Sequence, residues 1–317
     1  MLVQIYEIQE PHQAEPLLML GVEHIGSVVL DRERWRDPAV REVVRLTAGT
    51  ASRSSLIPLF SDVDTVLRVL DYYRPDIVHF CENIPLRREA AGRSGGLVEK
   101  LVHLQQVIKE RCPEIKITRS LPVPESHTVP EPEPSESSAS AAEPEAVLRP
   151  CPAAEGLWRP TDSGAVPDGD RRNCATPKQR KRPEEAKAAM RDGIAALVGI
   201  FAPVSDFFMT DTLLGEPGGA GGDAAQPVAG FVGITGATCD WELAAWLVRI
   251  SPRPVILAGG LGPENVAAAI ARVHPAGVDS CTRTNAVDLQ GRPIRFRKDF
   301  NKVQRFVAAA RRADAAS

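Results

Sequence analysis

The stretch from Pro254 to Val273 has the residue types of an anion-binding junction. Val255 to Ala258 are apolar and predict a buried strand, and Gly259 and Gly260 follow where the backbone must bend sharply or let a ligand approach. Pro263 then suits the first position of a helix. Because a helix start presents unpaired N–H groups and the positive end of the helix dipole, the junction predicts a phosphate site. An ordinary strand-to-helix turn is the alternative interpretation.

Eight short apolar runs alternate with helical patterns along the chain. We expect strands at residues 3–6, 24–29, 55–59, 76–80, 115–118, 206–210, 255–258 and 277–280. We expect helices at 63–73, 96–111, 184–199, 241–250, 263–273 and 298–310. This alternation predicts an α/β protein with a parallel, eight-stranded (β/α)8 TIM barrel. An open doubly wound sheet is the alternative, but no glycine follows the first strand in residues 6–10.

Residues 122–182 differ in composition from the rest of the chain. Proline and glutamate dominate up to residue 152, and a basic run follows at 171–182. We expect a disordered insertion here, between a first part of the barrel (1–121, strands one to five) and a second part (183–314, strands six to eight). The basic run is either a tether for nucleic acid or an acidic partner, or a solvated linker; we favour the linker.

Composition narrows the classes of function. A net charge of −3 over 317 residues supplies no basic field, so we expect no nucleic-acid partner. No apolar run approaches the length of a membrane span, and the first residues lack the blocks of a signal peptide, so we expect no membrane partner and a cytoplasmic protein. The six cysteines show neither C-x-x-C nor Cys/His spacing, which predicts free thiols and no metal site.

In a TIM barrel the chemistry lies at the carboxyl ends of the strands, and Asp211 ends the sixth. The chain then shows Gly233 to Trp241, Pro254 to Val266, Gly277 to Ser280 and Lys298-Asp299 in that order. This series resembles the phosphoribosylanthranilate isomerase family of tryptophan biosynthesis. The likeness is strongest over residues 207–306 and can be followed over 3–85, whereas the insertion has no counterpart.

The resemblance implies an Amadori rearrangement of a small phosphorylated ribosylamine such as N-(5-phosphoribosyl)anthranilate, without a cofactor, by a monomer or homodimer. It implies that Asp211 is the general acid, that Arg34 binds the anthranilate carboxylate, and that Gly259 and Gly260 form part of the phosphate site. These roles are physically sensible, because burial raises the pKa of a carboxyl group and an arginine fork binds a carboxylate with two hydrogen bonds. A helix-capping Asp211 and a solvated Arg34 are the alternatives.

The first strand departs from the family, whose Lys-Ile-Cys-Gly motif supplies a cysteine as general base. Here the motif is Gln4-Ile5-Tyr6-Glu7, so Tyr6 holds the position of the base. A phenol with a pKa near 10 is a poor base at neutral pH. Glu7 is a second candidate, although strand alternation points it toward the helices unless the strand has already ended.

The fourth strand offers another candidate pair. Where the family has Gln-Leu-His-Gly, this chain has His79-Phe80-Cys81-Glu82, so His79 and Cys81 share one face and point into the barrel. A thiol beside an imidazole can form an activated pair, and His79 is also a candidate for contact with the substrate. A buried, inert Cys81 is the alternative that we favour.

The phosphate loops are altered as well. Gly236 keeps its place in the family's Gly-Lys-Thr motif, but Ala237 replaces the lysine. After the eighth strand Thr282 retains a hydroxyl group, and Arg283 replaces a glycine that lets the phosphate approach. Arg283 either blocks the backbone site or donates its guanidinium to the phosphate, and we favour the second role. An isomerase is thus predicted; a non-catalytic or altered-substrate phosphosugar-binding barrel, acting as a sensor or scaffold, is the alternative.

Overall fold

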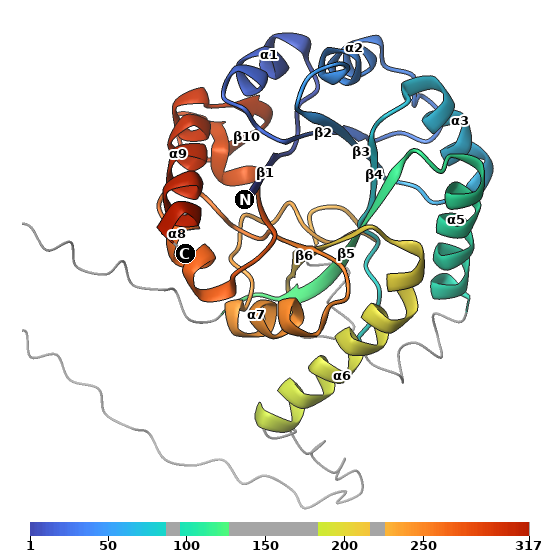
Figure 1. The fold of residues 1–317 in the computed structure, drawn as a ribbon, viewed down its shortest axis with the longest axis vertical. Coiled ribbons are helices and arrows are strands. Elements are labelled where there is room, and N and C mark those ends of the chain that lie inside the picture. The colour runs from blue at the N-terminus through green and yellow to red at the C-terminus, as the bar shows by residue number, and fades with distance from the viewer. Residues whose placement is uncertain (87–95, 127–182, 216–225, 317) are drawn as a thin grey trace, which may run out of the picture. The chain divides into compact units, whose positions relative to one another are not determined.

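The computed structural model describes residues 1–86, 96–126, 183–215 and 226–316. Eight parallel strands form a closed barrel in sequence order, and β8 pairs with β1 to complete the ring. Figure 1 shows the helices arranged around the outside of this ring. The strands are β1 (Leu2–Ile5), β2 (His24–Val29), β3 (Arg53–Pro58), β4 (Ile77–Phe80), β5 (Lys116–Pro124), β6 (Phe207–Leu213), β7 (Val255–Leu257) and β8 (Gly277–Ser280).

The outer layer follows the strands in alternation. Its helices are α1 (Pro11–Met19), α2 (Pro38–Thr47), α3 (Val63–Tyr73), α5 (Leu97–Arg111), α6 (Pro183–Phe201), α7 (Trp241–Ile250), α8 (Val266–Val273) and α9 (Phe300–Ala316), with short 3-10 helices η1 (Ala202–Val204) and η2 (Thr282–Thr284). Asp37, Asp62 and Asp240 begin α2, α3 and α7, where each carboxylate accepts hydrogen bonds from backbone N–H groups of the first turn. A hairpin of β9 (Asn285–Val287) and β10 (Pro293–Lys298) lies outside the barrel sheet.

Alternation along the strands separates two environments. Val3, Ile5 and Phe208 are fully buried in the apolar layer between the strands and the helices. Side chains at the alternate positions point into the barrel. Gln4, between Val3 and Ile5, donates there from Nε2 to the carboxylate of Asp279 at 3.1 Å. The barrel interior is therefore partly polar toward the carboxyl ends of its strands.

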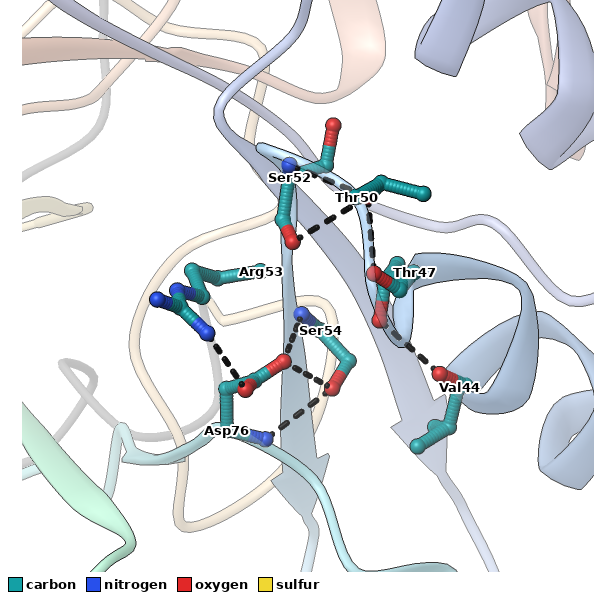
Figure 2. Close-up of polar contacts among 7 residues, drawn as sticks. All are labelled: Val44, Thr47, Thr50, Ser52, Arg53, Ser54 and Asp76. Carbon is teal, nitrogen blue, oxygen red and sulfur yellow. Dashed lines mark hydrogen bonds and ion pairs between the residues drawn. The ribbon is translucent and has the colours of Figure 1, made fainter.

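Polar contacts also form at the amino-terminal ends of the strands, at the opposite end of the barrel (Figure 2). The backbone N–H and the hydroxyl of Ser54 both donate to Asp76, at 2.8 and 2.9 Å, and Thr47 Oγ1 donates to the carbonyl of Val44 at 2.8 Å. The Ser54 bonds connect the start of β3 to the residue that precedes β4, and the Thr47 bond lies within the last turn of α2. Contacts at this end of a TIM barrel serve stability, so the site must be sought at the other end.

The structure confirms the predicted barrel, with all eight strands in the expected order. It differs at several boundaries, and three of these differences have a clear physical cause. β5 runs to Pro124, past the expected start of the insertion at residue 122, because Leu121 and Val123 bury completely while residues 118–124 pair with β6. The rest of the predicted insertion, from residue 127 to 182, lies outside the described residues.

The second difference concerns Pro263, which we expected at the first position of a helix. α8 begins only at Val266, and its N–H already donates to the carbonyl of Gly262. Asn265 holds the preceding turn, since its side chain donates to the carbonyl of Gly260 and accepts from the N–H of Gly262. The third is the final helix, which begins at Phe300 instead of residue 298, because Lys298 is the last residue of β10.

Among the residues that the structure describes, no helix is both long and apolar enough to cross a membrane.

Candidate active site

Two adjoining cavities lie at the carboxyl ends of the strands. The loops after β6, β7 and β8 line the first, which we call the polar cavity; its lining includes Thr212, Thr235, Gly236, Gly259, Gly260, Thr282 and Arg283. The second, which we call the apolar cavity, is lined by Tyr6, Val28, Ile57, Leu59, Met209 and Val232 among others. Asp211, Gly233 and Asp279 line both. The two carboxyl groups therefore lie where the cavities meet.

Asp211 on β6 has the surroundings of a general acid. Its side chain is buried, and the hydroxyl of Ser120 on β5 donates to its Oδ2. Burial raises the pKa of Asp211 to about 8; the bond from Ser120 opposes this shift and the charge of Asp279 adds to it. Asp211 consequently holds a proton at neutral pH, and its role as general acid stays a prediction from the family resemblance.

Asp279 on β8 is a second carboxyl group that our sequence analysis did not single out. Burial raises its pKa to about 7, against the hydrogen bond from Gln4 and the positive charge of Lys298. A fraction of Asp279 is therefore ionised at neutral pH, as a general base requires. Its position could have revealed it, because it lies near the carboxyl end of a predicted strand, two strands from Asp211.

Tyr6 is part of a chain of hydrogen bonds rather than a free base. Its hydroxyl lies 2.6 Å from Ser55 Oγ and 2.8 Å from His79 Nδ1, and His79 Nε2 lies 2.7 Å from Ser120 Oγ. Burial raises the pKa of the Tyr6 phenol well above its usual value. The geometry therefore does not support Tyr6 as the base, and both ring nitrogens of His79 are already engaged, which leaves neither for a substrate.

Cys81 faces the apolar cavity as expected, but its thiol is not activated. Burial, together with the negative charges of Asp211 and Glu82, raises its pKa well above the usual value for a thiol. Burial lowers the pKa of His79 to about 3, with a smaller contribution from the charge of Arg119, so no imidazolium is present to stabilise a thiolate. Cys81 is thus a buried, protonated thiol.

The other cysteines that the structure describes form no disulfide bond either. Cys112, Cys239 and Cys281 are free, like Cys81, whereas Cys151 and Cys174 lie outside the described residues. Within the described ranges, no group of three or more His, Cys, Asp and Glu side chains is placed to hold a metal ion.

Glu7 has a structural position. β1 ends at Ile5, and Glu7 adopts a left-handed backbone conformation with φ of 66°. Its carboxylate accepts hydrogen bonds from Asn285 Nδ2 at 3.0 Å and Arg295 Nε at 2.7 Å. Burial opposes ionisation, but the bond from Asn285 and the charges of Lys298 and Arg295 outweigh it and lower the pKa of Glu7. Glu7 thus fastens the barrel to the β9–β10 hairpin, which our sequence analysis did not predict.

Arg34 lies apart from the cavities. Its side chain is 89% exposed and pairs with Asp31 at 2.8 Å in the loop that follows β2. It lines neither the polar nor the apolar cavity. The structure therefore does not bring Arg34 to the site, and its role stays a prediction from the family resemblance.

Glycines allow the backbone to approach the polar cavity closely. Gly236, Gly259 and Gly260 all have positive φ, at 68°, 103° and 56°. A Cβ at Gly259 would lie 2.3 Å from Thr212 Oγ1, and one at Gly260 would lie 2.6 Å from the carbonyl carbon of Ala237. No larger residue fits at these two positions, so both local geometry and space require glycine.

Unpaired backbone donors border the same cavity. Within the described residues, the N–H groups of Gly260, Thr282 and Arg283 have no acceptor. Arg283 adds a guanidinium at the exposed rim, where its Nε donates to the carbonyl of Gly236 at 3.3 Å. Ser280 Oγ donates to the carbonyl of Leu261 at 2.7 Å and so connects the two loops. Such donors after strands seven and eight suit a phosphate.

Comparisons with known proteins find similarity to one isomerase family. The family model for N-(5'-phosphoribosyl)anthranilate isomerase matches residues 228–309. An isomerase of that name from Magnetococcus marinus is 44% identical over 86 residues, which are 27% of this chain and 37% of the relative. Another from Haloferax volcanii is 40% identical over 112 residues, 35% of this chain and 41% of the relative. The matched segments therefore span well under half of these relatives.

Solved structures show the same fold. The phosphoribosylanthranilate isomerase of Thermotoga maritima has a TM-score of 0.55 at 16% identity, with 98% of both chains covered. That of Pyrococcus furiosus has a TM-score of 0.53 at 16% identity, with 98% of this chain and 99% of the other covered. The segment matched by the family model contains Gly236, the glycines after β7, Asp279 and the loop with Arg283, whereas Asp211 and Tyr6 precede it. Over this segment the chain is similar to the phosphoribosylanthranilate isomerase family.

Proposed function

We propose that this protein is an N-(5'-phosphoribosyl)anthranilate isomerase that catalyses an Amadori rearrangement of a phosphorylated ribosylamine. The observation that carries the proposal is the placement of Asp211 and Asp279 where a donor-rich polar cavity meets an apolar one. The substrate has matching parts, a phosphate and an aromatic ring, with the reacting ribose carbons between them.

The polar cavity suits the phosphate. The unpaired N–H groups of Gly260, Thr282 and Arg283 can donate to its oxygens, and the Arg283 guanidinium adds a positive charge. The apolar cavity, with Val28, Ile57, Leu59 and Met209 in its wall, suits an aromatic ring. A related solved structure supports this assignment, since that phosphoribosylanthranilate isomerase is in complex with reduced 1-(o-carboxyphenylamino)-1-deoxyribulose 5-phosphate.

The two carboxyl groups then divide the proton transfers. Asp211 donates its proton to the ribose ring oxygen, so that the ring C–O bond breaks and the nitrogen lone pair forms a Schiff base at C1. The ionised form of Asp279 takes the proton from C2, and the released electron pair neutralises the iminium to give an enolamine. C1 then takes a proton from protonated Asp279 while the C2 enol hydroxyl gives its proton to ionised Asp211, which forms the ketone and returns both carboxyl groups to their starting states. Asp279 thus supplies the base that the family takes from its first strand.

Complementation of a host that lacks the isomerase tests this proposal. The wild-type chain should restore growth without tryptophan, and Asp211→Asn should abolish it, since loss of a general acid costs about 10²–10⁴ in rate. Asp62→Asn is the matched control, because asparagine also caps a helix and Asp62 lies at the start of α3. Failure of the well-expressed wild-type chain to restore growth would refute the proposed substrate.

A further inference from the structure

The hydrogen-bond chain that ends on Asp211 contains Ser55, Tyr6, His79 and Ser120, from four different strands or strand ends. All four side chains are at least 97% buried. This hydrogen-bond chain crosses the barrel, and Ser55, Tyr6, His79 and Ser120 have no role in the proton transfers proposed for Asp211 and Asp279. The effect of the chain on Asp211 depends on the direction in which its O–H and N–H groups donate.

With Ser120 as the donor to Asp211 Oδ2, the other contacts of the chain follow in one direction. Ser120 donates its only proton to Asp211 Oδ2, so toward His79 it can only accept. His79 Nε2 must therefore carry a hydrogen. Because burial keeps the imidazole neutral, Nδ1 is then the acceptor and receives the hydrogen of the Tyr6 hydroxyl. Ser55 in turn donates to the Tyr6 oxygen, so every donor in the chain points toward Asp211.

This direction places the acidic proton. With Oδ2 of Asp211 held as an acceptor, the carboxyl hydrogen belongs on Oδ1. That atom accepts no hydrogen bond from the described residues and faces Gly233, where an added Cβ would lie 2.6 Å from it. Gly233 lines both cavities, so Oδ1 is the oxygen that a substrate can reach.

We infer that Tyr6, His79 and Ser120 are positioning residues that fix His79 as its Nε2–H tautomer and direct the proton of Asp211 from Oδ1 into the cavities. Tyr6 occupies the position at which the family has its base. Here it acts on the acid, Asp211, only through His79 and Ser120. The catalytic meaning of this inference rests on the proposed function, but the direction of the hydrogen bonds does not.

NMR of the unliganded protein tests the direction without any substrate. In ¹⁵N-histidine-labelled protein, with the signal assigned through His79→Asn, His79 should show a protonated Nε2 and an unprotonated Nδ1. A protonated Nδ1 in the wild-type protein would overturn the inference, because the chain would then point away from Asp211. If the wild-type protein proves inactive on the ribosylamine, the proposed function fails while this result still stands.

Two variants test the coupling to Asp211, whose carboxyl pKa can be followed by ¹³C NMR. Other titratable groups near it are Asp279, Cys81, Cys239 and Tyr6 itself. Ser120→Ala removes a hydrogen bond to the carboxylate and should raise the pKa of Asp211 by about one unit. Tyr6→Phe should raise it by less and weaken the preference of His79 for the Nε2–H tautomer, because only the contact with Ser120 then maintains it.

Matched controls separate this role from loss of any buried hydroxyl. Tyr73 donates to the carbonyl of Trp35, and Ser205 accepts from Gln105, both away from the cavities. Tyr73→Phe and Ser205→Ala should leave the pKa of Asp211 and the tautomer of His79 unchanged. If Tyr6→Phe and Ser120→Ala fold but behave like these controls, the inference is wrong.

Discussion

Asp279 on β8 raises the pKa of Asp211 on β6 through its charge, and both carboxyl groups line the same two cavities. Burial contributes more than this charge to the raised pKa of Asp211, and burial is also the largest cause of the raised pKa of Asp279. The result is a pair of carboxyl groups that titrate near neutral pH instead of near pH 4. Such a pair can supply a proton and accept one in the same reaction.

The pair predicts a narrow, bell-shaped dependence of kcat/KM on pH. The base requires ionised Asp279, whose pKa is about 7, so activity should fall as the pH drops below that value. The acid requires protonated Asp211, whose pKa is about 8, so activity should also fall as the pH rises above it. Initial rates from pH 5 to 10 measure both limbs, which belong to the coupled pair. A flat profile across pH 6–9 would contradict the assignment.

The raised pKa of Asp211 also predicts a cost in stability. The folded state binds this proton more tightly than the unfolded chain, so its stabilising effect is complete below the usual pKa of 3.8 and is lost as the pH rises to about 8. Asp211→Asn removes the ionisation. Its free energy of unfolding relative to wild type should therefore rise by up to about 1.4 kcal/mol per pH unit between pH 5 and 8, then level off.

Urea unfolding across this range measures the difference. Asp62→Asn is the control, because hydrogen bonds from Thr65 outweigh burial and lower the pKa of Asp62. Its stability relative to wild type should not rise with pH. A constant difference between Asp211→Asn and wild type would show that Asp211 titrates normally.

Gly260 should be essential for phosphate binding. Gly260→Ala would place a Cβ 2.6 Å from the Ala237 carbonyl carbon and force the loops of the polar cavity apart. We expect the affinity for inorganic phosphate or a phosphorylated product to fall at least 10-fold, which calorimetry can measure. Gly49 is a matched control, since its φ of 78° is also left-handed but no atom lies within 4 Å of an added Cβ. Equal losses of affinity in the two variants would contradict a specific role for Gly260.

Glu7 should matter for stability and not as a base. Glu7→Gln removes a buried charge held by Asn285 and Arg295, so the free energy of unfolding at pH 7 should fall by about 2–4 kcal/mol. Because its pKa is lowered, this contribution is present above pH 4.5 and is lost as the pH falls further. The rate of the folded variant should fall by less than the ~100-fold expected for loss of a base.

The exposed Glu242 is a control for this variant. It pairs with Lys187 and Arg272, but its side chain is 56% exposed, so Glu242→Gln should change stability far less than Glu7→Gln does. A loss of activity above 100-fold in Glu7→Gln with unchanged stability would reverse the assignment and make Glu7 the base.

The order of the barrel strands could be predicted from the sequence because apolar runs and helical periodicity are local signals. The positions of Asp211, Gly259 and Gly260 at the carboxyl ends of the strands could be predicted in the same way, whereas their roles stay predictions. The surroundings of Tyr6 and Glu7 could not be predicted in this way. The surroundings of Tyr6 are set by hydrogen bonds to Ser55 on β3 and His79 on β4. Those of Glu7 are set by Arg295 in the β9–β10 hairpin, which is far away in the sequence.

Ser120 was missed for a different reason. The prolines at 122 and 124 resemble the start of the Pro/Glu-rich insertion, so the fifth strand was expected to stop too early. Pairing with β6 overrides that local signal and brings Ser120 beside Asp211. Contacts between strands thus decide which polar residues form the site.

Direct assay of the purified chain on N-(5'-phosphoribosyl)anthranilate tests the central claim. The wild-type protein should form the 1-deoxyribulose product, detected by mass spectrometry, while Asp211→Asn and Asp279→Asn should each lower kcat by about 10²-fold or more and still bind the product. Asp62→Asn should match wild type. A folded wild-type protein that binds the product but does not form it would contradict the assignment of Asp211 and Asp279 as acid and base.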